Sequence, residues 1–263
     1  MRIEVAPTPK EFAEADDRTA VVVVDVFRAT TTITTALANG ARFVLPAADV
    51  EQAMKLAEPY GDNEVVLGGE RDCVRIEGFQ LGNSPREYSR EVVGGKVVIF
   101  TTTNGTRALL AARDAGAVFM GCFLNAGRVA AAVAGWPRVV VLCAGNDGRL
   151  SLEDFACAGG IVDRLALPAG DAGAAEPAPP KPRRRVTTLD PEVSGLELDD
   201  GAFASWAAFR ECRRHLARRL VTTEHARRLA GLGFAADLEF ALRTDSVPLV
   251  PHFSDGRIEV RPV

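Results

Sequence analysis

The sequence predicts an α/β fold, in which a mainly parallel or mixed sheet lies between helices in a three-layer α/β/α arrangement. Short runs of β-branched residues alternate with segments that have the apolar period of a helix. Several helical segments follow capping residues, and polar residues gather where strand-like runs end. Strand–helix alternation of this kind is typical of parallel sheets with helices on their faces.

Seven short segments have the composition of strands. In chain order they are residues 21–26, 43–45, 65–67, 97–100, 139–142, 246–251 and 257–260. The first begins with four valines, which are followed by Asp25 and Val26. The segments at 97–100 and 139–142 are apolar throughout, which is typical of strands that are buried on both faces.

The expected helices lie between these strands. They comprise residues 30–38, a segment after Asp49, a segment after Ser84, and residues 106–115, 152–165, 202–217 and 223–230. Three of their starts carry capping boxes: Asp49 with Gln52, Ser84 with Glu87, and Ser151 with Asp154. Pro85 occupies a first helical position, where proline is favoured.

The chain has the size and composition of one packed domain. It contains 263 residues, of which 47% are hydrophobic and 25% charged. We therefore expect a single domain over residues 1–263, with a division into two lobes left open. Residues 167–185 are rich in Pro, Ala and Gly and lack an apolar period, so they are expected to form a flexible insertion within it.

Composition also limits the partners and the compartment. With a net charge of −4, the chain lacks the excess of positive charge that is typical of nucleic-acid-binding proteins. The first residues lack the apolar core of a signal peptide, and the longest apolar runs are too short to span a membrane. The five cysteines form no CxxC pair, as expected of reduced thiols. These features favour a cytoplasmic protein with neither nucleic acid nor membrane as a partner.

Five polar loops follow predicted strands or begin predicted helices. They are residues 25–30, 68–71, 82–85, 101–107 and 143–154. Because parallel strands end at one edge of a sheet, several of these loops are expected to meet there. Threonine hydroxyls and helix N-termini suit the oxygens of phosphate or sulfonate, and acidic side chains suit Mg²⁺. The three histidines all lie late in the chain, so we expect no zinc site.

Each loop alone also has a structural explanation. Asp25 and Ser84 could cap helices, and Glu70 with Arg71 could form a surface ion pair. Asn104 followed by Gly105 is a common turn signal. The case for a site therefore rests on the loops converging.

Two other phosphatase mechanisms have partial signatures. Phosphatases of the haloacid dehalogenase type end a strand with Asp-x-Asp, but the second acid is replaced here by Phe27. Cys143 and Arg149 have the Cys-x5-Arg spacing of cysteine-dependent phosphatases. Asp147 lies inside that loop, where a carboxylate would repel phosphate, and Cys143 continues an apolar strand. Both mechanisms are therefore disfavoured.

Four segments together resemble the 2-phosphosulfolactate phosphatases, the ComB family of coenzyme M biosynthesis. They are DVFRATTTITTALANGA, LGGERDCVRIEGFQLGNSPREY, TTTNGTRAL and VVLCAGNDGRLSLEDFACAGGIVDRL, with a weaker match near the C-terminus. The resemblance implies a Mg²⁺-dependent α/β phosphatase. Its reaction would convert 2-phospho-3-sulfolactate, or a related phosphorylated 2-hydroxy acid, to 3-sulfolactate and phosphate.

The hypothesis that follows is metal-assisted hydrolysis. Asp25, Glu70 and Asp154 would bind Mg²⁺, and Asp25, Arg28 and Glu153 would be catalytic. The residues expected to bind the small anionic substrate are Thr30, Asn83, Ser84, Thr102, Thr103, Asn104, Gly105, Thr106 and Asp147. Either Asp147 or Glu153 would be the general acid or base.

Three alternatives stay open. Asp237 and Asp245 either complete the site or cap helices, with capping favoured. A non-catalytic protein that binds a small phosphorylated or sulfonated acid could use the same anion-binding loops. A homodimer is also compatible with the sequence.

Overall fold

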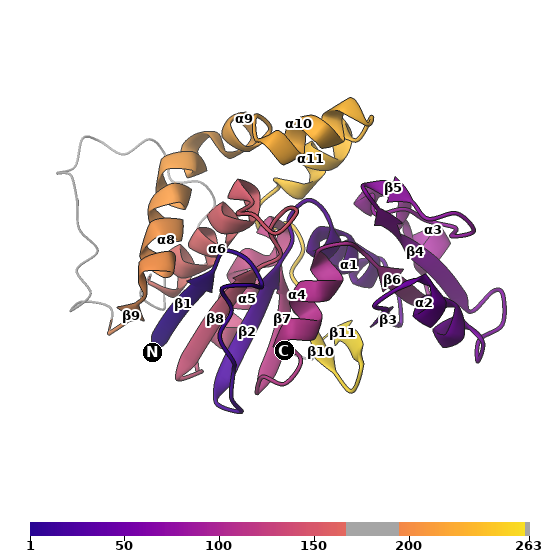
Figure 1. Ribbon diagram of the computed structural model, residues 1–263, viewed down its shortest axis with the longest axis horizontal. Helices are drawn as coiled ribbons and strands as arrows, with labels where there is room; N and C mark the ends of the chain where they lie inside the picture. Colours follow the sequence, from indigo (N-terminus) through magenta and orange to yellow (C-terminus); the bar gives the residue numbers. More distant parts are fainter. Residues whose placement is uncertain (167–194, 261–263) are drawn as a thin grey trace.

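The computed structural model describes residues 1–166 and 195–260. The insertion predicted at residues 167–185 lies outside the described residues. Within them, one sheet of eleven strands has the order β5-β4-β6-β3-β11-β10-β7-β2-β8-β1-β9 (Figure 1). Helices cover it on both sides, which confirms the expected three-layer α/β/α fold. No helix in the described part of the chain is long and apolar enough to cross a membrane.

The strands are β1 (Arg2–Ala6), β2 (Thr19–Val24), β3 (Phe43–Pro46), β4 (Val65–Arg71), β5 (Val74–Arg75), β6 (Val97–Thr101), β7 (Ala117–Gly121), β8 (Arg138–Cys143), β9 (Glu197–Leu198), β10 (Pro251–Ser254) and β11 (Arg257–Val260). The helices are α1 (Ala29–Ala38), α2 (Val50–Ala57), α3 (Arg90–Val93), α4 (Gly105–Ala112), α5 (Ala126–Val133), α6 (Leu152–Leu165), α8 (Asp200–Cys212), α9 (Leu216–Leu220), α10 (Glu224–Gly231) and α11 (Ala235–Ala241). Short 3-10 turns occur at Pro85–Glu87, Phe123–Asn125 and Arg213–His215.

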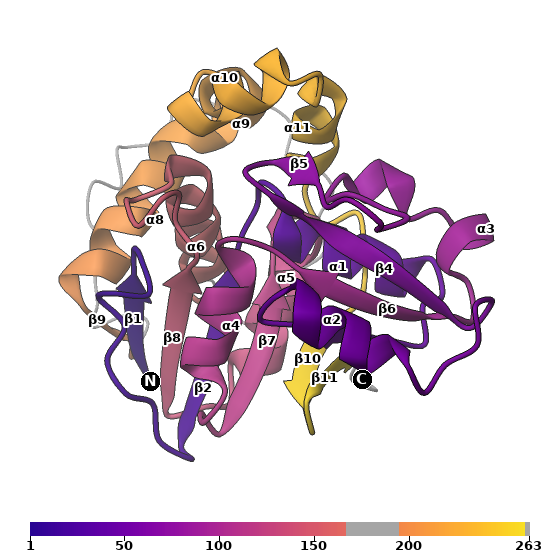
Figure 2. The same cartoon turned by 45° about the vertical axis from the view of Figure 1, so that its right-hand side comes forward.

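The sheet is mixed because it joins two parallel groups. Strands β4, β6 and β3 form one group, and β7, β2, β8, β1 and β9 form the other. The antiparallel hairpin β10–β11 lies between them and pairs antiparallel on both sides, so the groups run in opposite directions. Strand twist of about 20–25° per step turns β6 roughly 100–125° relative to β2 over five steps. The carboxyl ends of both groups therefore approach each other below α10 and α11 (Figure 2).

The alternating side chains of β2 show how the layers form. Ala20, Val22 and Val24 join the core cluster beneath α5, α6 and α8, whereas Val21 and Val23 join the cluster that contains residues of α1 and α4. The second cluster also includes apolar residues of β3, β4 and β6, so α1 and α4 pack between the two parallel groups. Helix α2 contributes Ala53 to a third cluster, on the other face of β6.

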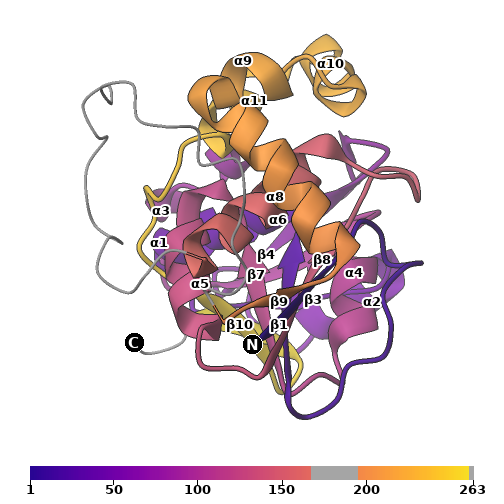
Figure 3. The same ribbon diagram turned by 90° about the vertical axis from the view of Figure 1, so that its left-hand side faces the viewer.

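Helix α8 packs across α6 beside the edge of the sheet that carries β1 and β9 (Figure 3). The close approach depends on Gly159 in α6, because a Cβ there would collide with the backbone of Ser205 in α8. The glycine therefore fixes how near the C-terminal helices come to the sheet.

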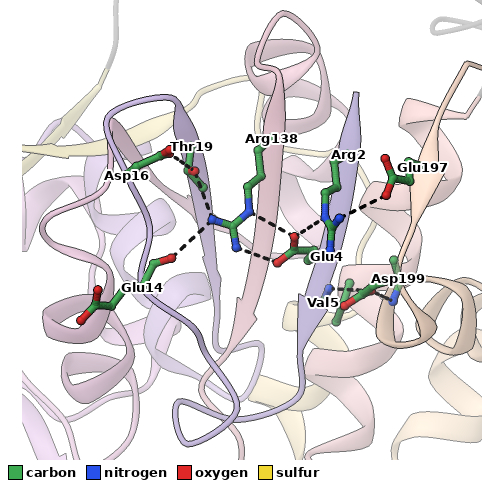
Figure 4. Close-up of polar contacts among 10 residues, drawn as sticks. Arg2, Glu4, Val5, Glu14, Asp16, Thr19, Arg138, Glu197 and Asp199 are labelled. Carbon is green, nitrogen blue, oxygen red and sulfur yellow. Dashed lines mark hydrogen bonds and ion pairs between the residues drawn. The ribbon is translucent and has the colours of Figure 1, made fainter.

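A polar network joins the amino ends of β1, β2 and β8 (Figure 4). Arg138 donates to both oxygens of Glu4, at 3.1 Å from Nε and 2.8 Å from Nη2. Arg2 reaches Glu4 and Glu197, and thereby connects β1 with β9. This network lies at the end of these strands opposite to the polar loops.

Several elements differ from the sequence-based expectation. The strand predicted at 246–251 begins only at Pro251, and the helix predicted at 202–217 breaks at the 3-10 turn Arg213–His215. Glu70 lies inside β4 and not in a loop after it, because β4 continues far enough to pair with β5. Strands β1, β5, β7 and β9 and helices α5 and α11 were not predicted.

Candidate active site

A cavity opens where the carboxyl ends of the two parallel groups meet α10. Its lining comes from six separate stretches of chain: Asp25, Phe27 and Arg28; Glu70, Asp72 and Cys73; Asn83; Thr103 and Asn104; Asn146 and Asp147; and His225, Arg228 and Leu229. The cavity thus brings together seven residues that the sequence predicted for the site: Asp25, Arg28, Glu70, Asn83, Thr103, Asn104 and Asp147.

Asp25 directly follows β2 and is 7% exposed. Its Oδ1 accepts a hydrogen bond of 3.1 Å from the backbone N–H of Ala29, so it supports the first turn of α1 as a cap would. Burial raises the pKa of Asp25 to about 6, against the lowering effect of the Ala29 hydrogen bond. The buried carboxylate is therefore costly to keep ionised unless a cation lies beside it.

Glu70 connects the two strand ends that form the opposite wall. Its Oε1 accepts from the Thr103 N–H at 2.8 Å, and its Oε2 accepts from the Cys73 N–H at 2.7 Å. The charge of Glu70 contributes to the raised pKa of Asp25. The two acids, far apart in the sequence, therefore face one cavity.

Arg28 is buried and held from three sides. Its Nη1 donates to Asp237 Oδ2 at 2.9 Å, its Nη2 donates to the Cys73 carbonyl at 3.3 Å, and its guanidinium stacks 4.0 Å from the centre of the Phe234 ring. Ser84 Oγ donates to the other oxygen of Asp237 at 2.7 Å, and no side-chain cap forms at the Ser84 helix start. The predicted Ser84 cap was therefore wrong.

The preference for Asp237 as a helix cap was also wrong, since its carboxylate bonds Arg28 and Ser84. Asp245 behaves as expected of a cap: it accepts from the Gly127 N–H at 2.7 Å in the first turn of α5, and it pairs with Arg164. The weakly matching C-terminal block thus contributes Asp237 and Phe234, which hold Arg28, and the lining residues Arg228 and Leu229.

The predicted substrate-binding threonines mostly lie behind the cavity wall. Thr30 Oγ1 donates to the carbonyls of Asp25 and Gly121, and Thr102 and Thr106 exchange side-chain and backbone hydrogen bonds. Together with Gly105 they line a second, separate cavity. These threonines therefore fix the shape of the loops that carry Asp25 and Thr103.

Asp154 holds the loops after β2 and β8 together. Its Oδ1 accepts from the Val26 N–H at 2.7 Å and its Oδ2 from the Gly145 N–H at 3.1 Å. Burial, followed by the charges of Asp25 and Glu153, raises the pKa of Asp154 well above its usual range.

Ser151 does not cap α6, because its hydroxyl makes no hydrogen bond and the Asp154 carboxylate bonds the neighbouring loops instead. The predicted Ser151–Asp154 capping box was therefore wrong.

Glu153 has a partner that the sequence did not suggest. Its Oε1 lies 2.8 Å from Nδ1 of His225, which reaches the cavity from α10. The segment EHARRLAG around His225 is polar and resembles an ordinary surface helix, so no sequence signal marks it. Cys73, Asn146 and Arg228 are further lining residues that were not predicted.

Two buried oxygens on the cavity wall have no hydrogen-bond partner: Asn83 Oδ1 and Thr103 Oγ1. Unpaired buried oxygens are rare, and they point to a bound group that completes them. Asp25 supplies a carboxylate to the lining of the same cavity. This set of oxygen donors fits a hard cation such as Mg²⁺. Among the described residues no three His, Cys, Asp or Glu side chains cluster as metal ligands, so amide, hydroxyl or water oxygens would have to complete the shell.

The two disfavoured mechanisms gain no support from the geometry. Cys143 is 0% exposed, and burial raises its pKa well above the usual range, so the thiol is neither accessible nor ionised. Phe27 lines the cavity at the position where a second acid would be required. Asp147 lies at the rim, is largely exposed, and approaches Arg228 to 3.5 Å.

Comparison with known proteins agrees with the sequence resemblance. The model of a family described as 2-phosphosulpholactate phosphatase matches residues 6–256. A protein of Caldanaerobacter subterraneus subsp. tengcongensis named "Probable 2-phosphosulfolactate phosphatase" is 37% identical over 237 residues, which cover 90% of this chain and 88% of the relative. Two further relatives carry the same name. The protein of Symbiobacterium thermophilum is 38% identical, and the match covers 90% of this chain and 92% of the relative. The protein of Carboxydothermus hydrogenoformans is 36% identical, and the match covers 99% of this chain and 97% of the relative.

Proposed function

The chain belongs to the 2-phosphosulfolactate phosphatase family, and from this membership we propose that it hydrolyses 2-phospho-3-sulfolactate, or a related phosphorylated 2-hydroxy acid, with Mg²⁺ as cofactor. The family makes it a phosphoric monoester hydrolase. The observation that carries the finer proposal is the cavity itself, whose lining includes Asp25, Glu70 and the two residues with unpaired buried oxygens.

The charge balance of the cavity supports a divalent cation. Four acids line it, Asp25, Glu70, Asp72 and Asp147, against the cations Arg28, Arg228 and His225. Arg28 is already neutralised by Asp237, and Glu153 neutralises His225. An anionic substrate would therefore meet a net negative wall unless a metal ion were bound.

Asp25, Asn83 and Thr103 would hold the ion, with Glu70 fixing the Thr103 loop through its backbone N–H. When bound, Mg²⁺ would neutralise phosphoryl oxygens and lower the pKa of a coordinated water. Arg28, held rigid by Asp237, would donate its remaining N–H groups to phosphoryl oxygens. The N-terminus of α4, at Asn104 on the cavity wall, would favour an anion there.

The rival function is non-catalytic binding of the same acids. A binder of anions gains nothing from four carboxylates around its ligand, so the lining favours the phosphatase. Purified protein that binds phosphorylated 2-hydroxy acids and releases no phosphate from any of them would favour the binder.

The direct test is a screen of phosphorylated 2-hydroxy acids, including 2-phospho-3-sulfolactate, for phosphate release. Release should stop in excess EDTA and return when Mg²⁺ is added in excess of the chelator. Turnover that persists undiminished in the chelator would remove the metal from the proposal.

Asp25→Asn should lower kcat by on the order of 10²-fold or more, because it removes a charge from the reacting centre. Cys143→Ser should retain activity.

A further inference from the structure

We propose that His225 is the general acid of this phosphatase: it donates a proton to the alcohol oxygen as the phosphate ester breaks, and Glu153 positions it for that task. The inference rests on the proposed function and assigns one step of it. It replaces both acids that the sequence left open for this role, Asp147 and Glu153.

The placement of the imidazole is the first observation. His225 lies on α10 and lines the cavity, where the edge of its ring faces the ring of Phe27 at a centroid distance of 6.3 Å. Its side chain is 11% exposed, so little bulk water competes for it. A substrate in the cavity would therefore be within reach of the ring.

The hydrogen bond to Glu153 is the second observation. Glu153 Oε1 lies 2.8 Å from Nδ1 and its side chain is 1% exposed, so the carboxylate cannot turn away into solvent. A buried carboxylate at Nδ1 fixes the proton on that nitrogen and stabilises the imidazolium. Nε2 is then the nitrogen available to the Cys73 side chain, which also hydrogen-bonds the ring, or to a bound molecule that takes its place.

The surrounding groups keep the ring charged. Burial acts to lower the pKa of His225, but hydrogen bonding with Cys73 and Glu153 and the charges of Glu153 and Asp25 outweigh it and raise the pKa to about 10. Asp154 also lies within electrostatic range of the ring. The imidazolium therefore carries its proton throughout the neutral range.

The reaction requires such a donor. Hydrolysis transfers the phosphoryl group to water, and the bond between phosphorus and the alcohol oxygen breaks with its electron pair on that oxygen. An alkoxide is a poor leaving group, so it must take up a proton as the bond breaks. His225 gives the Nε2 proton to this oxygen and recovers one from solvent, while the attacking water releases its own proton to solvent as phosphate forms.

The other candidates fit the role less well. Glu153 is 0% exposed and is absent from the cavity lining, so it can act only through His225. Asp147 is at the rim beside Arg228. Arg28 and Arg228 face the cavity, but a guanidinium does not release its proton in proteins.

The test compares two substrates on the same preparation of each variant. One is the phosphorylated 2-hydroxy acid that the wild-type enzyme turns over best, which has an alkoxide leaving group. The other is 4-nitrophenyl phosphate, whose phenolate leaves without a proton. His225→Gln should lose about 10²–10⁴-fold in kcat on the alkyl ester and less than about tenfold on the aryl ester. The ratio of the two rates does not depend on the fraction of folded protein.

Glu153→Gln tests the positioning role. The amide oxygen of this variant can still accept from Nδ1 but lacks the charge, so the fall of activity at high pH should begin at a lower pH than in the wild type. His215→Gln, an exposed histidine on the neighbouring 3-10 turn, is the matched control and should leave both rates unchanged.

The outcomes separate the inference from the proposed function. Equal losses of His225→Gln on both esters, or no loss on either, would overturn the general acid while leaving the phosphatase intact. A wild-type enzyme that releases no phosphate from any alkyl ester would overturn the proposed function, and the inference with it.

Discussion

Asp25 carries a carboxylate into a site where only 7% of the residue is exposed. Its pKa is about 6 in the folded protein and near 3.8 when unperturbed, because burial disfavours the charged form. Between these pH values the folded state binds the proton more tightly than the unfolded state does. The contribution of Asp25 to the free energy of unfolding therefore decreases as the pH rises through this window.

Asp25→Asn should consequently make the metal-free protein more stable at pH 7, while it lowers kcat by on the order of 10²-fold or more. We expect a gain on the order of 1–3 kcal/mol in the free energy of unfolding, measured with urea in EDTA. The difference between variant and wild type should shrink towards pH 4, where the wild-type carboxyl is protonated. A variant that is less stable than the wild type at pH 7 would contradict this assignment.

The ion pair of Arg28 and Asp237 is buried on both sides, with 2% of each side chain exposed. Asp237→Asn would leave the guanidinium without a counter-ion, which costs about 3–5 kcal/mol in buried pairs. Asp245→Asn is the matched control, since its pair with Arg164 is 44% and 21% exposed and should cost less than about 1 kcal/mol. Urea denaturation of both variants checks this, and equal losses would contradict the distinction.

At the scale of elements, α1 and α4 meet at Gly105, the first residue of α4. A Cβ at this position would lie 2.6 Å from Cβ of Ala29 and 2.9 Å from Oδ2 of Asp25. The missing side chain therefore allows the two helix starts to approach each other beside the Asp25 carboxylate.

Gly105→Ala should push these helix starts apart. We expect a loss of about 1–3 kcal/mol in stability from overpacking, and at least a tenfold loss in kcat/KM because Asp25 moves. Gly135→Ala is the control, since a Cβ there has no heavy atom within 4 Å. If Gly105→Ala retained the wild-type kcat/KM, the close approach of Gly105 to Asp25 would not be required for activity.

The sequence predicted some elements closely and missed others for physical reasons. The expected strands at 97–100 and 139–142 correspond to β6 and β8 within one residue at each end, because burial on both faces leaves an uninterrupted apolar run. Strand β7 was missed because its segment AVFMG is short and ends in glycine. Strand β10 was displaced because its first residue, Pro251, follows an extended apolar segment that does not pair in the sheet.

The site was predictable only as far as local sequence reaches. Asp25 stands out because it ends a run of valines, and Glu70 because it lies in a distinctive polar segment. His225 could not be found, because its carboxylate partner is 72 residues away and its own helix has a plain surface composition. The role of Asp237 could not be predicted for the same reason, since its contacts with Arg28 and Ser84 join residues that are 209 and 153 positions apart in the sequence.

At the scale of the whole molecule, the site is shared between two parallel groups of strands that run in opposite directions. Asp25 comes from the β2 side, whereas Glu70 and Thr103 come from β4 and from the loop after β6. The hairpin β10–β11 joins the groups through the pairs Ile258 with Val44 and Phe253 with Val118. The relative position of these cavity residues therefore depends on a hairpin that contributes no residue to the cavity lining.

Ile258→Ala tests this dependence. Ile258 is 0% exposed in the core cluster shared by both groups, so its truncation should cost about 2–5 kcal/mol and lower Tm by roughly 2–4 °C for each kcal/mol. Because the hairpin holds both walls of the cavity, we expect one cooperative transition and a thermal loss of phosphatase activity that coincides with it. Val260→Ala, on the same strand and 41% exposed, should leave Tm nearly unchanged. Two separate calorimetric transitions in Ile258→Ala would show instead that the groups fold independently of the hairpin.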